Sequence, residues 1–326
     1  MHWPSQQLFL TDERLAALAE RCRPAFKAEC EAMHIDNDLS AQLESLYLPL
    51  AAWLRASRGA DQNTQVVGVC GAQGSGKSTL CRLLGTVLGE AFDESAVALS
   101  IDDIYETRER RAELAVEMHP LFATRGVPGT HDVALGLSII DRLMRLRAGQ
   151  SMPLPAFDKA MDARLAPDQW RCQRGRVAHV LFEGWCVGAL PESEAALVEP
   201  INDLERDEDP DGVWRRAVNA RLRGDYQQLF ARIDVLILLR VDGIGRVFQW
   251  RRLQEHKLAR AAAADAGGAD SRIMTDAQVD RFIMHYERLT RHILAEMPER
   301  ADIVFDLDES HSAARVHINN PIDGTL

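Results

Sequence analysis

The sequence predicts an α/β fold, in which a parallel sheet of about five strands carries helices on both faces and follows an N-terminal helical extension. Three observations predict it. Short apolar runs alternate with helical patterns along most of the chain, as in parallel sheets buried on both faces. The first of these runs leads directly into a glycine-rich loop. The N-terminal part, by contrast, contains helical patterns and no strand-like run.

The N-terminal part reads as two helices. Between residue 12 and about residue 58, apolar residues such as Leu15, Leu18, Leu43 and Leu46 recur at helical spacing. Serine, glycine and aspartate residues then break the pattern between Arg55 and Asn63. We therefore expect a helical extension over residues 1–62 and a main domain over residues 63–326.

Five apolar runs in the main domain predict its strands. They cover residues 65–70, 96–101, 177–182, 233–241 and 303–305. Between the second and third runs, one face of a helix is marked by Val133, Leu137, Ile140 and Met144. Functional loops are expected at the carboxyl ends of the strands.

The amino-acid composition limits the kinds of molecule that the protein is expected to bind. The 326 residues carry 49 acids and 38 bases, a net charge of −11, which argues against nucleic-acid binding through bulk charge. Six scattered cysteines show no zinc or disulfide pattern, and the longest aliphatic runs are too short to cross a bilayer. We expect a soluble cytoplasmic protein that binds a small molecule, neither nucleic acid nor membrane, in an oligomeric state that the sequence leaves open.

Two charged stretches interrupt this pattern. Residues 199–211 carry seven acids and predict a solvated surface loop, whereas residues 240–260 carry six bases. Only four of the bases in the chain are lysines, namely Lys27, Lys77, Lys159 and Lys257. A lysine retained where arginine is the usual cation indicates a position that suits a compact charge.

The glycine-rich loop matches G-x-x-x-x-G-K-[ST] between a predicted strand and a predicted helix, the context of a P-loop NTPase. Its backbone N–H groups and the helix N-terminus form an anion site. Lys77 is expected at the β- and γ-phosphates of ATP, and Ser78 at Mg²⁺. The expected ATP-binding residues are Gly71, Ala72, Gln73, Gly74, Ser75, Gly76, Lys77, Ser78 and Thr79.

A carboxylate at the end of the second predicted strand favours a kinase over other P-loop proteins. None of the four lysines lies in the [NT]-K-x-D box by which GTPases specify guanine. Asp102 ends the second strand, where a base would face the γ-phosphate and orient an acceptor hydroxyl. An aspartate in this position also commonly caps a helix.

Several further motifs occur in a fixed order. They are Ser100-Ile101-Asp102-Asp103-Ile104-Tyr105, Arg125-Gly126-Val127-Pro128-Gly129-Thr130-His131-Asp132, Pro155-Ala156-Phe157-Asp158-Lys159, Leu181-Phe182-Glu183-Gly184-Trp185, Val218-Asn219 with Leu222 and Tyr226, and Gln249-Trp250-Arg251. From about residue 64 to 308, the series resembles the D-glycerate 3-kinases and, more broadly, the superfamily of uridine kinase, pantothenate kinase and phosphoribulokinase.

The resemblance implies a role for each matching position. Asp102 would be the general base, with Asp103 a weaker candidate beside it, and Glu183 would order Mg²⁺ through water. Arg246, Arg251 and Arg252 would lie on a lid at about residues 243–275, with Arg246 at the nucleotide and the other two closing over the transferred phosphoryl group. The acceptor pocket would contain Asp103, Tyr105, Arg125, His131, Asp132, Asp158 and Lys159.

Simpler roles remain open for some of these residues. His131 and Asp132 could form a helix-capping pair, and Arg251 or Arg252 could be an exposed helix cation. Phe157 and Trp185 favour packing over substrate stacking, and Trp250 favours a core position with arginine stacking.

The resemblance implies an ATP- and Mg²⁺-dependent kinase that phosphorylates a hydroxyl of a small hydroxy acid, D-glycerate to 3-phosphoglycerate being the first choice. Arg125 and Lys159 could supply the cations that a carboxylate substrate requires. Isoleucine at position 104, where phenylalanine is commoner, keeps other acceptors open, such as a nucleoside, pantothenate or an unknown metabolite. A non-catalytic ATP-binding switch is a further alternative.

Overall fold

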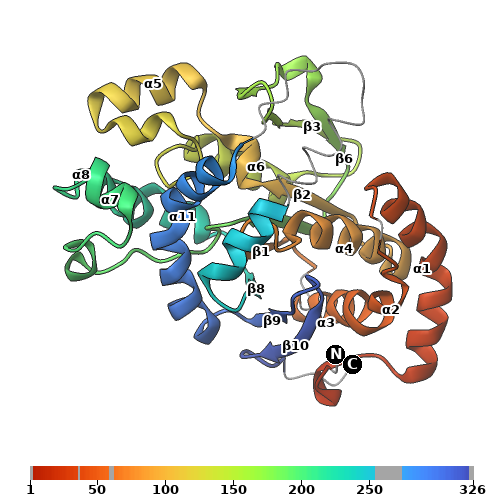
Figure 1. Cartoon of the computed structure of the whole chain (residues 1–326). Helices are drawn as coiled ribbons and strands as arrows, with labels where there is room; N and C mark the ends of the chain where they lie inside the picture. Colours follow the sequence, from red (N-terminus) through yellow and green to blue (C-terminus); the bar gives the residue numbers. More distant parts are fainter. Residues whose placement is uncertain (1–2, 36, 59–61, 254–273, 323–326) are drawn as a thin grey trace, which may run out of the picture.

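A six-stranded sheet forms the centre of the computed structural model, which describes residues 3–35, 37–58, 62–253 and 274–322 (Figure 1). The strand order is β10-β9-β8-β1-β7-β2. Five strands are parallel, and β10 pairs with β9 in the antiparallel direction. The strands are β1 (Gln65–Gly71), β2 (Ala96–Ser100), β7 (His179–Gly184), β8 (Val235–Arg240), β9 (Ile303–Leu307) and β10 (Ala313–Ile318).

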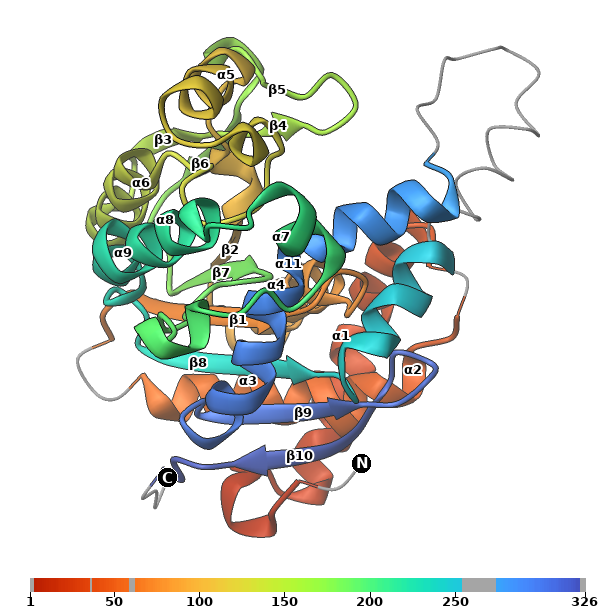
Figure 2. The same ribbon diagram turned by 60° about the vertical axis from the view of Figure 1, so that its left-hand side comes forward.

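Both faces of the sheet are covered, as the apolar runs predict. Neighbouring residues of β1 point to opposite sides, so that Val66 lies in one hydrophobic cluster and Val67 in another. Figure 2 shows α1 (Asp12–Ala32), α3 (Leu48–Ser57) and α4 (Lys77–Phe92) on one face. The opposite face carries α6 (Val133–Arg145), α8 (Val213–Arg221), α9 (Gln227–Phe230) and α11 (Asp276–Glu296).

The N-terminal helices share one hydrophobic cluster with the sheet. The second helix predicted there consists of α2 (Ser40–Gln42), a π-helical turn (Leu43–Tyr47) and α3. Leu18 of α1 and Leu50 of α3 are buried in the same cluster as Leu83 of α4 and Ile237 of β8. The extension therefore forms one layer of the sandwich, although the boundary at residue 62 remains a prediction.

The two ends of the described chain are also joined. The Gln7 side chain donates to the Ile322 carbonyl (3.1 Å) and accepts from its N–H (2.9 Å). The same amide oxygen accepts from the indole N–H of Trp53.

A long excursion lies between β2 and β7 and carries the predicted acceptor residues. It contains α5 (Arg108–Glu117), α6, a ribbon of β3 (Ser151–Leu154) with β6 (Arg171–Arg174), and a short hairpin of β4 (Phe157–Asp158) with β5 (Ala163–Arg164). On α6, Val133 and Ile140 are buried as predicted, but Met144 is 40% exposed and Leu143 is buried in its place.

The acidic stretch 199–211 is not a solvated loop throughout, and that prediction is wrong for two of its acids. It contains α7 (Asp203–Glu208), and both Glu205 and Asp209 are buried. Arg288 of α11 pairs with Glu205 at 2.7 Å, and Arg215 of α8 pairs with Asp209 at 3.0 Å. A buried carboxylate needs such a partner, and the nearby sequence does not show it.

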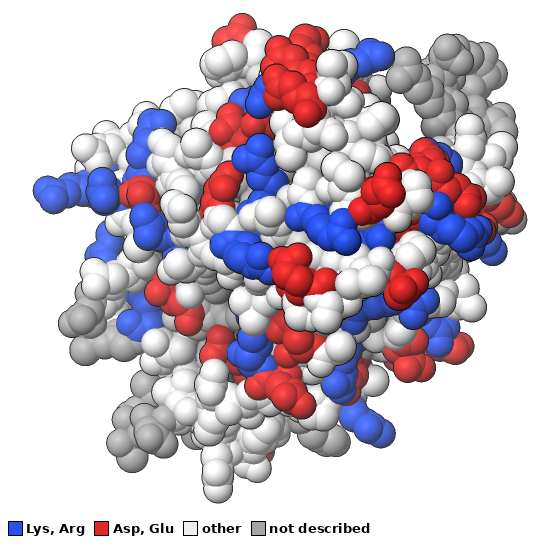
Figure 3. Space-filling view, turned by 90° about the vertical axis from the view of Figure 1, so that its left-hand side faces the viewer, with Lys and Arg blue, Asp and Glu red and all other residues white. Residues whose placement is uncertain are grey.

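The α/β class and the five parallel strands are confirmed, whereas β10 was not predicted. The six cysteines are free. None of the helices in the described ranges has the length and apolar character that a bilayer span requires. On the face in Figure 3, acidic and basic side chains are interspersed. Lys257 lies outside the described residues, as does most of the predicted lid.

Candidate active site

The phosphate-binding loop connects β1 to α4 as predicted. β1 ends at Gly71, and α4 begins at Lys77. Gly74 and Gly76 have φ angles of +79° and +86°, which only glycine adopts readily. The Lys77 ammonium donates to the Ala72 carbonyl at 2.9 Å, so it lies over the loop. This geometry brings together the predicted ATP-binding residues from Gly71 to Thr79.

A hydroxyl and a carboxylate meet at the first turn of α4. Ser78 Oγ donates to Glu183 Oε1 at 2.8 Å. Glu183 stands opposite Val69 in the register of β7 with β1, which places it at the same end of the sheet as the loop. The pair fits Mg²⁺, because that ion takes oxygen ligands and is held by one or two side chains together with phosphate oxygens and waters. No group of three or more His, Cys, Asp or Glu in the described part of the chain could hold a metal.

Asp102 lies beside this pair. In the register of β2 with β7, Ser100 stands opposite Glu183, and the chain then turns into a 3₁₀ helix over Ile101–Ile104. Asp102 Oδ1 accepts from the Tyr105 hydroxyl at 2.7 Å. Its Oδ2 accepts from the Lys159 ammonium at 2.6 Å. The predicted base therefore has a defined orientation between two donors.

Asp103 has a different environment. Its Oδ2 accepts from the Ser100 N–H at 3.1 Å, while Ser100 Oγ accepts from the Asp102 N–H at 3.2 Å. These bonds form a capping box at the start of the 3₁₀ helix. The structure thus gives Asp103 a structural role, and its predicted contact with substrate stays a prediction.

The two aspartates also differ in acidity. Burial favours the neutral form of Asp102, but the charge of Lys159 and the hydrogen bonds from Lys159 and Tyr105 outweigh it and lower the pKa of Asp102. Burial raises the pKa of Asp103, and the charges of Asp102 and Glu183 add to this. Asp102 is therefore the more acidic of the two carboxyl groups.

The β4–β5 hairpin brings Lys159 to Asp102. Asp158 Oδ1 accepts from the N–H groups of Ala160 and Met161 at 2.8 and 3.0 Å, which closes the turn. The Asp158 side chain therefore shapes the hairpin, and a contact with the acceptor remains untested. Lys159, at the turn itself, extends its ammonium to the predicted base.

Arg125 ties the acceptor loop 125–132 to this hairpin. Its Nη1 pairs with Asp162 at 2.5 Å, and its Nη2 donates to the Lys159 carbonyl at 3.1 Å. The guanidinium also lies 5.6 Å from the centre of the Phe157 ring. Arg111 of α5 pairs with Asp162 at 2.7 Å. Sequence reasoning missed Arg111 and Asp162, because neither belongs to a recognised motif.

His131 and Asp132 occupy the base of the loop. The His131 ring stacks on Tyr105, with 4.6 Å between the ring centres, and its Nδ1 lies 2.6 Å from the Tyr226 hydroxyl. Burial lowers the pKa of His131 to about 4. Asp132 caps α6 by accepting from the Leu135 N–H. Asp132 therefore has the simpler capping role, whereas the His131 ring packs against the Tyr105 ring.

No family model matches this chain. It is 34% identical over 229 residues to the uncharacterized kinase mug58 of Schizosaccharomyces pombe, covering 68% of this chain and 78% of that protein. Its fold matches the D-glycerate 3-kinase from Cryptococcus neoformans var. grubii with a TM-score of 0.66 and 25% identity, over 83% of this chain and 96% of that one. The chain belongs to the D-glycerate 3-kinase-like P-loop kinases.

The likeness extends more weakly to other kinases. This kinase is 28% identical over 142 residues to the pantothenate kinase of Streptococcus gordonii, a match that spans 43% of the present chain and 42% of that protein. The family suggested by the sequence motifs is therefore confirmed, whereas the relatives differ in the acceptor that their names give.

Each of the predicted lid arginines of the kinase contacts another part of the chain. Arg246 pairs with Glu309 at 2.9 Å, beyond β9. Arg252 makes two hydrogen bonds to Asp280 of α11, and the Arg251 guanidinium lies 5.6 Å from the Phe282 ring. Closure of Arg251 and Arg252 over a phosphoryl group, and contact of Arg246 with the nucleotide, stay predictions.

A cleft of about 580 Å³ opens beside the phosphate loop of the kinase. Its walls come from the loop, from the N-terminal segment and from the chain that follows β9. His311 Nδ1 lies 2.9 Å from the Gly74 carbonyl oxygen, and its ring stacks on Trp250 with 3.9 Å between the centres. Trp250 therefore stacks on a histidine rather than on an arginine.

Two aromatic residues, one of them on α11, hold the acceptor loop of the kinase through hydrogen bonds to its backbone. The Tyr286 hydroxyl donates to the Arg125 carbonyl at 2.9 Å, and Trp185 Nε1 donates to the Gly126 carbonyl at 2.8 Å. Trp185 thus packs, as its simpler role predicts. Tyr286 was missed in the sequence because it belongs to none of the motifs.

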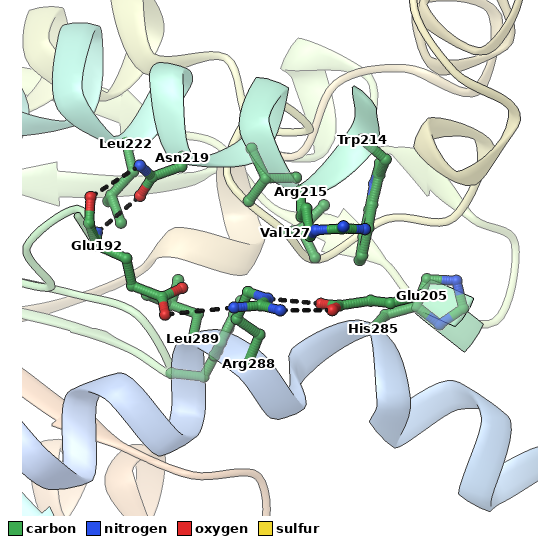
Figure 4. Close-up of a pocket in the computed structure, with 12 residues that line it drawn as sticks. Val127, Glu192, Glu205, Trp214, Arg215, Asn219, Leu222, His285, Arg288 and Leu289 are labelled. Carbon is green, nitrogen blue, oxygen red and sulfur yellow. Dashed lines mark hydrogen bonds and ion pairs between the residues drawn. The ribbon is translucent and has the colours of Figure 1, made fainter. Parts of the chain in front are cut away.

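Two residues further along α11, Arg288 anchors the helix to the acidic stretch. Its guanidinium bonds to both carboxylate oxygens of Glu205 and pairs with Glu192 at 3.5 Å (Figure 4). The adjoining cavity, which Val127 also lines, measures about 20 Å³. It has room for about one water molecule and none for an acceptor.

Proposed function

We propose that this kinase transfers the γ-phosphoryl group of MgATP to a hydroxyl of a small hydroxy acid, with D-glycerate as the first choice of acceptor and 3-phosphoglycerate as the product. The observation that carries the proposal is the placement of Asp102. An acidic carboxylate stands at the strand end next to the phosphate loop. Lys159 is in contact with it, and Arg125 of the acceptor loop donates to the Lys159 carbonyl.

Positioning and charge neutralisation account for most of the catalysis in such a transfer. The loop N–H groups and Lys77 would hold the phosphates, and Ser78 with Glu183 would hold Mg²⁺, which neutralises charge on the phosphate oxygens when it is bound. Asp102 would orient the acceptor hydroxyl and receive its proton. The cleft beside Gly74 is the place that we assign to the nucleoside part of ATP.

The two cations support an acidic acceptor. Lys159 belongs to the hairpin turn, and Arg125 of the acceptor loop donates to its carbonyl, so both cations lie near Asp102. Cations so placed favour a ligand with a carboxylate. A neutral nucleoside offers no group for these charges, which is why we place a hydroxy acid before uridine.

An acceptor screen tests the proposal. ADP release would be measured with D-glycerate, glycerol, uridine and pantothenate, with Asp102→Asn enzyme as the control for coupled background. We expect D-glycerate to stimulate ADP release most, and ³¹P NMR to identify the product as 3-phosphoglycerate.

Other outcomes separate the alternatives. Turnover of uridine or pantothenate without turnover of D-glycerate would overturn the acceptor and keep the kinase. Tight ATP binding with no stimulation by any hydroxyl compound would favour the non-catalytic switch.

A further inference from the structure

The predicted base is engaged on both of its oxygens. Asp102 accepts from the Tyr105 hydroxyl through Oδ1 and from the Lys159 ammonium through Oδ2. An ammonium at 2.6 Å stabilises the charged carboxylate, so that Asp102 is a weaker proton acceptor while the contact lasts. For proton transfer the contact must therefore weaken when an acceptor is bound.

In the ion pair between Lys159 and Asp102, the lysine ammonium is free to move away. The Lys159 side chain is 62% exposed, whereas that of Asp102 is 25% exposed. An ion pair with so exposed a partner contributes little net free energy, since water competes for the ammonium. Lysine also has a flexible side chain with a single charged nitrogen. Position 159 has a lysine in a chain that mostly uses arginine as its cation.

The backbone beneath Lys159 is fixed, however. Its carbonyl accepts from Arg125, and Asp158 closes the turn through the N–H groups of Ala160 and Met161. Arg125 is held in turn by Asp162. The ammonium can thus exchange partners by side-chain rotation while the hairpin stays in place.

We propose that Lys159 acts as a charge-sensing latch: it pairs with Asp102 until an anionic group of the acceptor draws the ammonium away and frees the carboxylate to take the hydroxyl proton. This inference deepens the proposed function and rests on it for the identity of the acceptor. An anionic acceptor would bring the competing charge, and a neutral one would leave the latch closed.

The reaction balances with no further component. The acceptor oxygen forms a bond to the γ-phosphorus of ATP, and the bond from that phosphorus to the bridging oxygen breaks, with its electron pair leaving on ADP. The hydroxyl proton moves to Asp102. Lys159 keeps its charge throughout and changes only its partner, from Asp102 to the acceptor carboxylate. It is therefore a positioning and specificity-determining residue.

The test removes the latch in Lys159→Met enzyme and compares D-glycerate, glycerol and water as acceptors. Lys27→Met is the matched control, because Lys27 is an exposed lysine of α1 whose partner is Glu31. In Lys159→Met enzyme we expect the KM for D-glycerate to rise about tenfold or more, as an ion pair to substrate is lost. Basal ATP hydrolysis and glycerol turnover should both rise about two- to fivefold, because Asp102 is free.

The pH profile gives a second readout. The titratable groups that face Asp102 are Lys159, Tyr105, His131, Asp103, Cys186 and Tyr286. Loss of the Lys159 charge removes a cause that lowers the pKa of Asp102, so the acid limb of the basal ATP hydrolysis profile should move to higher pH. Lys27→Met should leave that limb and all rates unchanged.

The outcomes distinguish the latch from the proposed function. If Lys159 only binds the carboxylate, Lys159→Met will raise the KM for D-glycerate without any gain in hydrolysis or glycerol turnover, which overturns the latch. A different result would keep the latch and overturn the proposed acceptor. In that case D-glycerate would not stimulate the wild-type enzyme, Lys159→Met would raise the rate of ATP hydrolysis, and adding Asp102→Asn would abolish this gain.

Discussion

The adjacent residues Asp102 and Asp103 have different roles in the structure. Asp103 closes a capping box with the Ser100 N–H, while Asp102 turns toward Tyr105 and Lys159. The difference comes from the 3₁₀ turn, in which successive side chains point about 120° apart. We therefore expect substitutions of the two aspartates to have different effects on the activity.

Asp102→Asn should lower kcat by about two to four decades, because an amide cannot accept the hydroxyl proton. ATP affinity should change little, since Asp102 does not belong to the phosphate loop. Steady-state kinetics and ATP titration would measure both. Asp103→Asn is the matched variant, and a larger loss of kcat there than in Asp102→Asn would contradict the assigned base.

A second residue prediction concerns His131, whose pKa burial lowers from 6.5 to about 4. The unfolded chain binds a proton at this residue over that interval and the folded chain does not, so stability must fall as pH decreases from about 6.5 to 4. The maximum contribution is roughly 3 kcal/mol. Urea unfolding at pH 7 and pH 5 should show a smaller loss on acidification in His131→Asn, which does not titrate, than in wild type.

At the scale of elements, α11 connects two parts of the site. Its first turns contact the lid arginines through Asp280 and Phe282, and Tyr286 then bonds to the Arg125 carbonyl. Arg288 ties the same helix to Glu205. The acceptor loop is thus held by a helix that also contacts the lid residues.

Gly126→Ala tests this packing. Gly126 has a φ of +130°, and an added Cβ would lie 2.0 Å from the Tyr286 hydroxyl oxygen. We expect the free energy of unfolding to fall by about 2 kcal/mol or more, because strain and overlap act together. Urea unfolding would measure it.

Gly89→Ala is the control for that variant. Gly89 lies inside α4, and a Cβ there would have no neighbour within 4 Å. Alanine should raise stability by up to about 1 kcal/mol, since it favours the helix. Equal losses in the two variants would argue against the described contact with Tyr286.

How far the sequence predicts these elements depends on the range of the interactions. The strands and the phosphate loop follow from local patterns, since β1 and the residues from Gly71 to Ser78 lie next to each other in the chain. The acidic stretch was misread because the partner of Glu205 is Arg288, 83 residues away. Asp162 and Tyr286 escaped notice for the same reason, as their partners come from other elements.

At the scale of the whole molecule, the N-terminal helices are a layer of the main core. Leu50 of α3 is fully buried in the cluster that includes β8 and α4. The Gln7 contact with Ile322 adds a link between the two ends. We expect the layers to unfold together.

Leu50→Ala should lower the free energy of unfolding by about 2 to 5 kcal/mol, because it leaves a cavity in this core. Val116→Ala is the control, since Val116 is 90% exposed and its truncation should change stability by less than about 0.5 kcal/mol. Far-UV circular dichroism and tryptophan fluorescence should report one coincident transition. Separate transitions would indicate that the extension folds on its own.

The register of the central strands places Val69, Glu183 and Ser100 in one row at the sheet edge. Glu183 belongs to this row, and the phosphate loop and Asp102 follow directly after β1 and β2. Lys159 and Arg125 come instead from the hairpin and the acceptor loop, outside the sheet. Evolution can therefore alter the hairpin and the loop without disturbing the phosphate chemistry. A lineage built this way can acquire new acceptors by changing its appended parts while inheriting the same catalytic row.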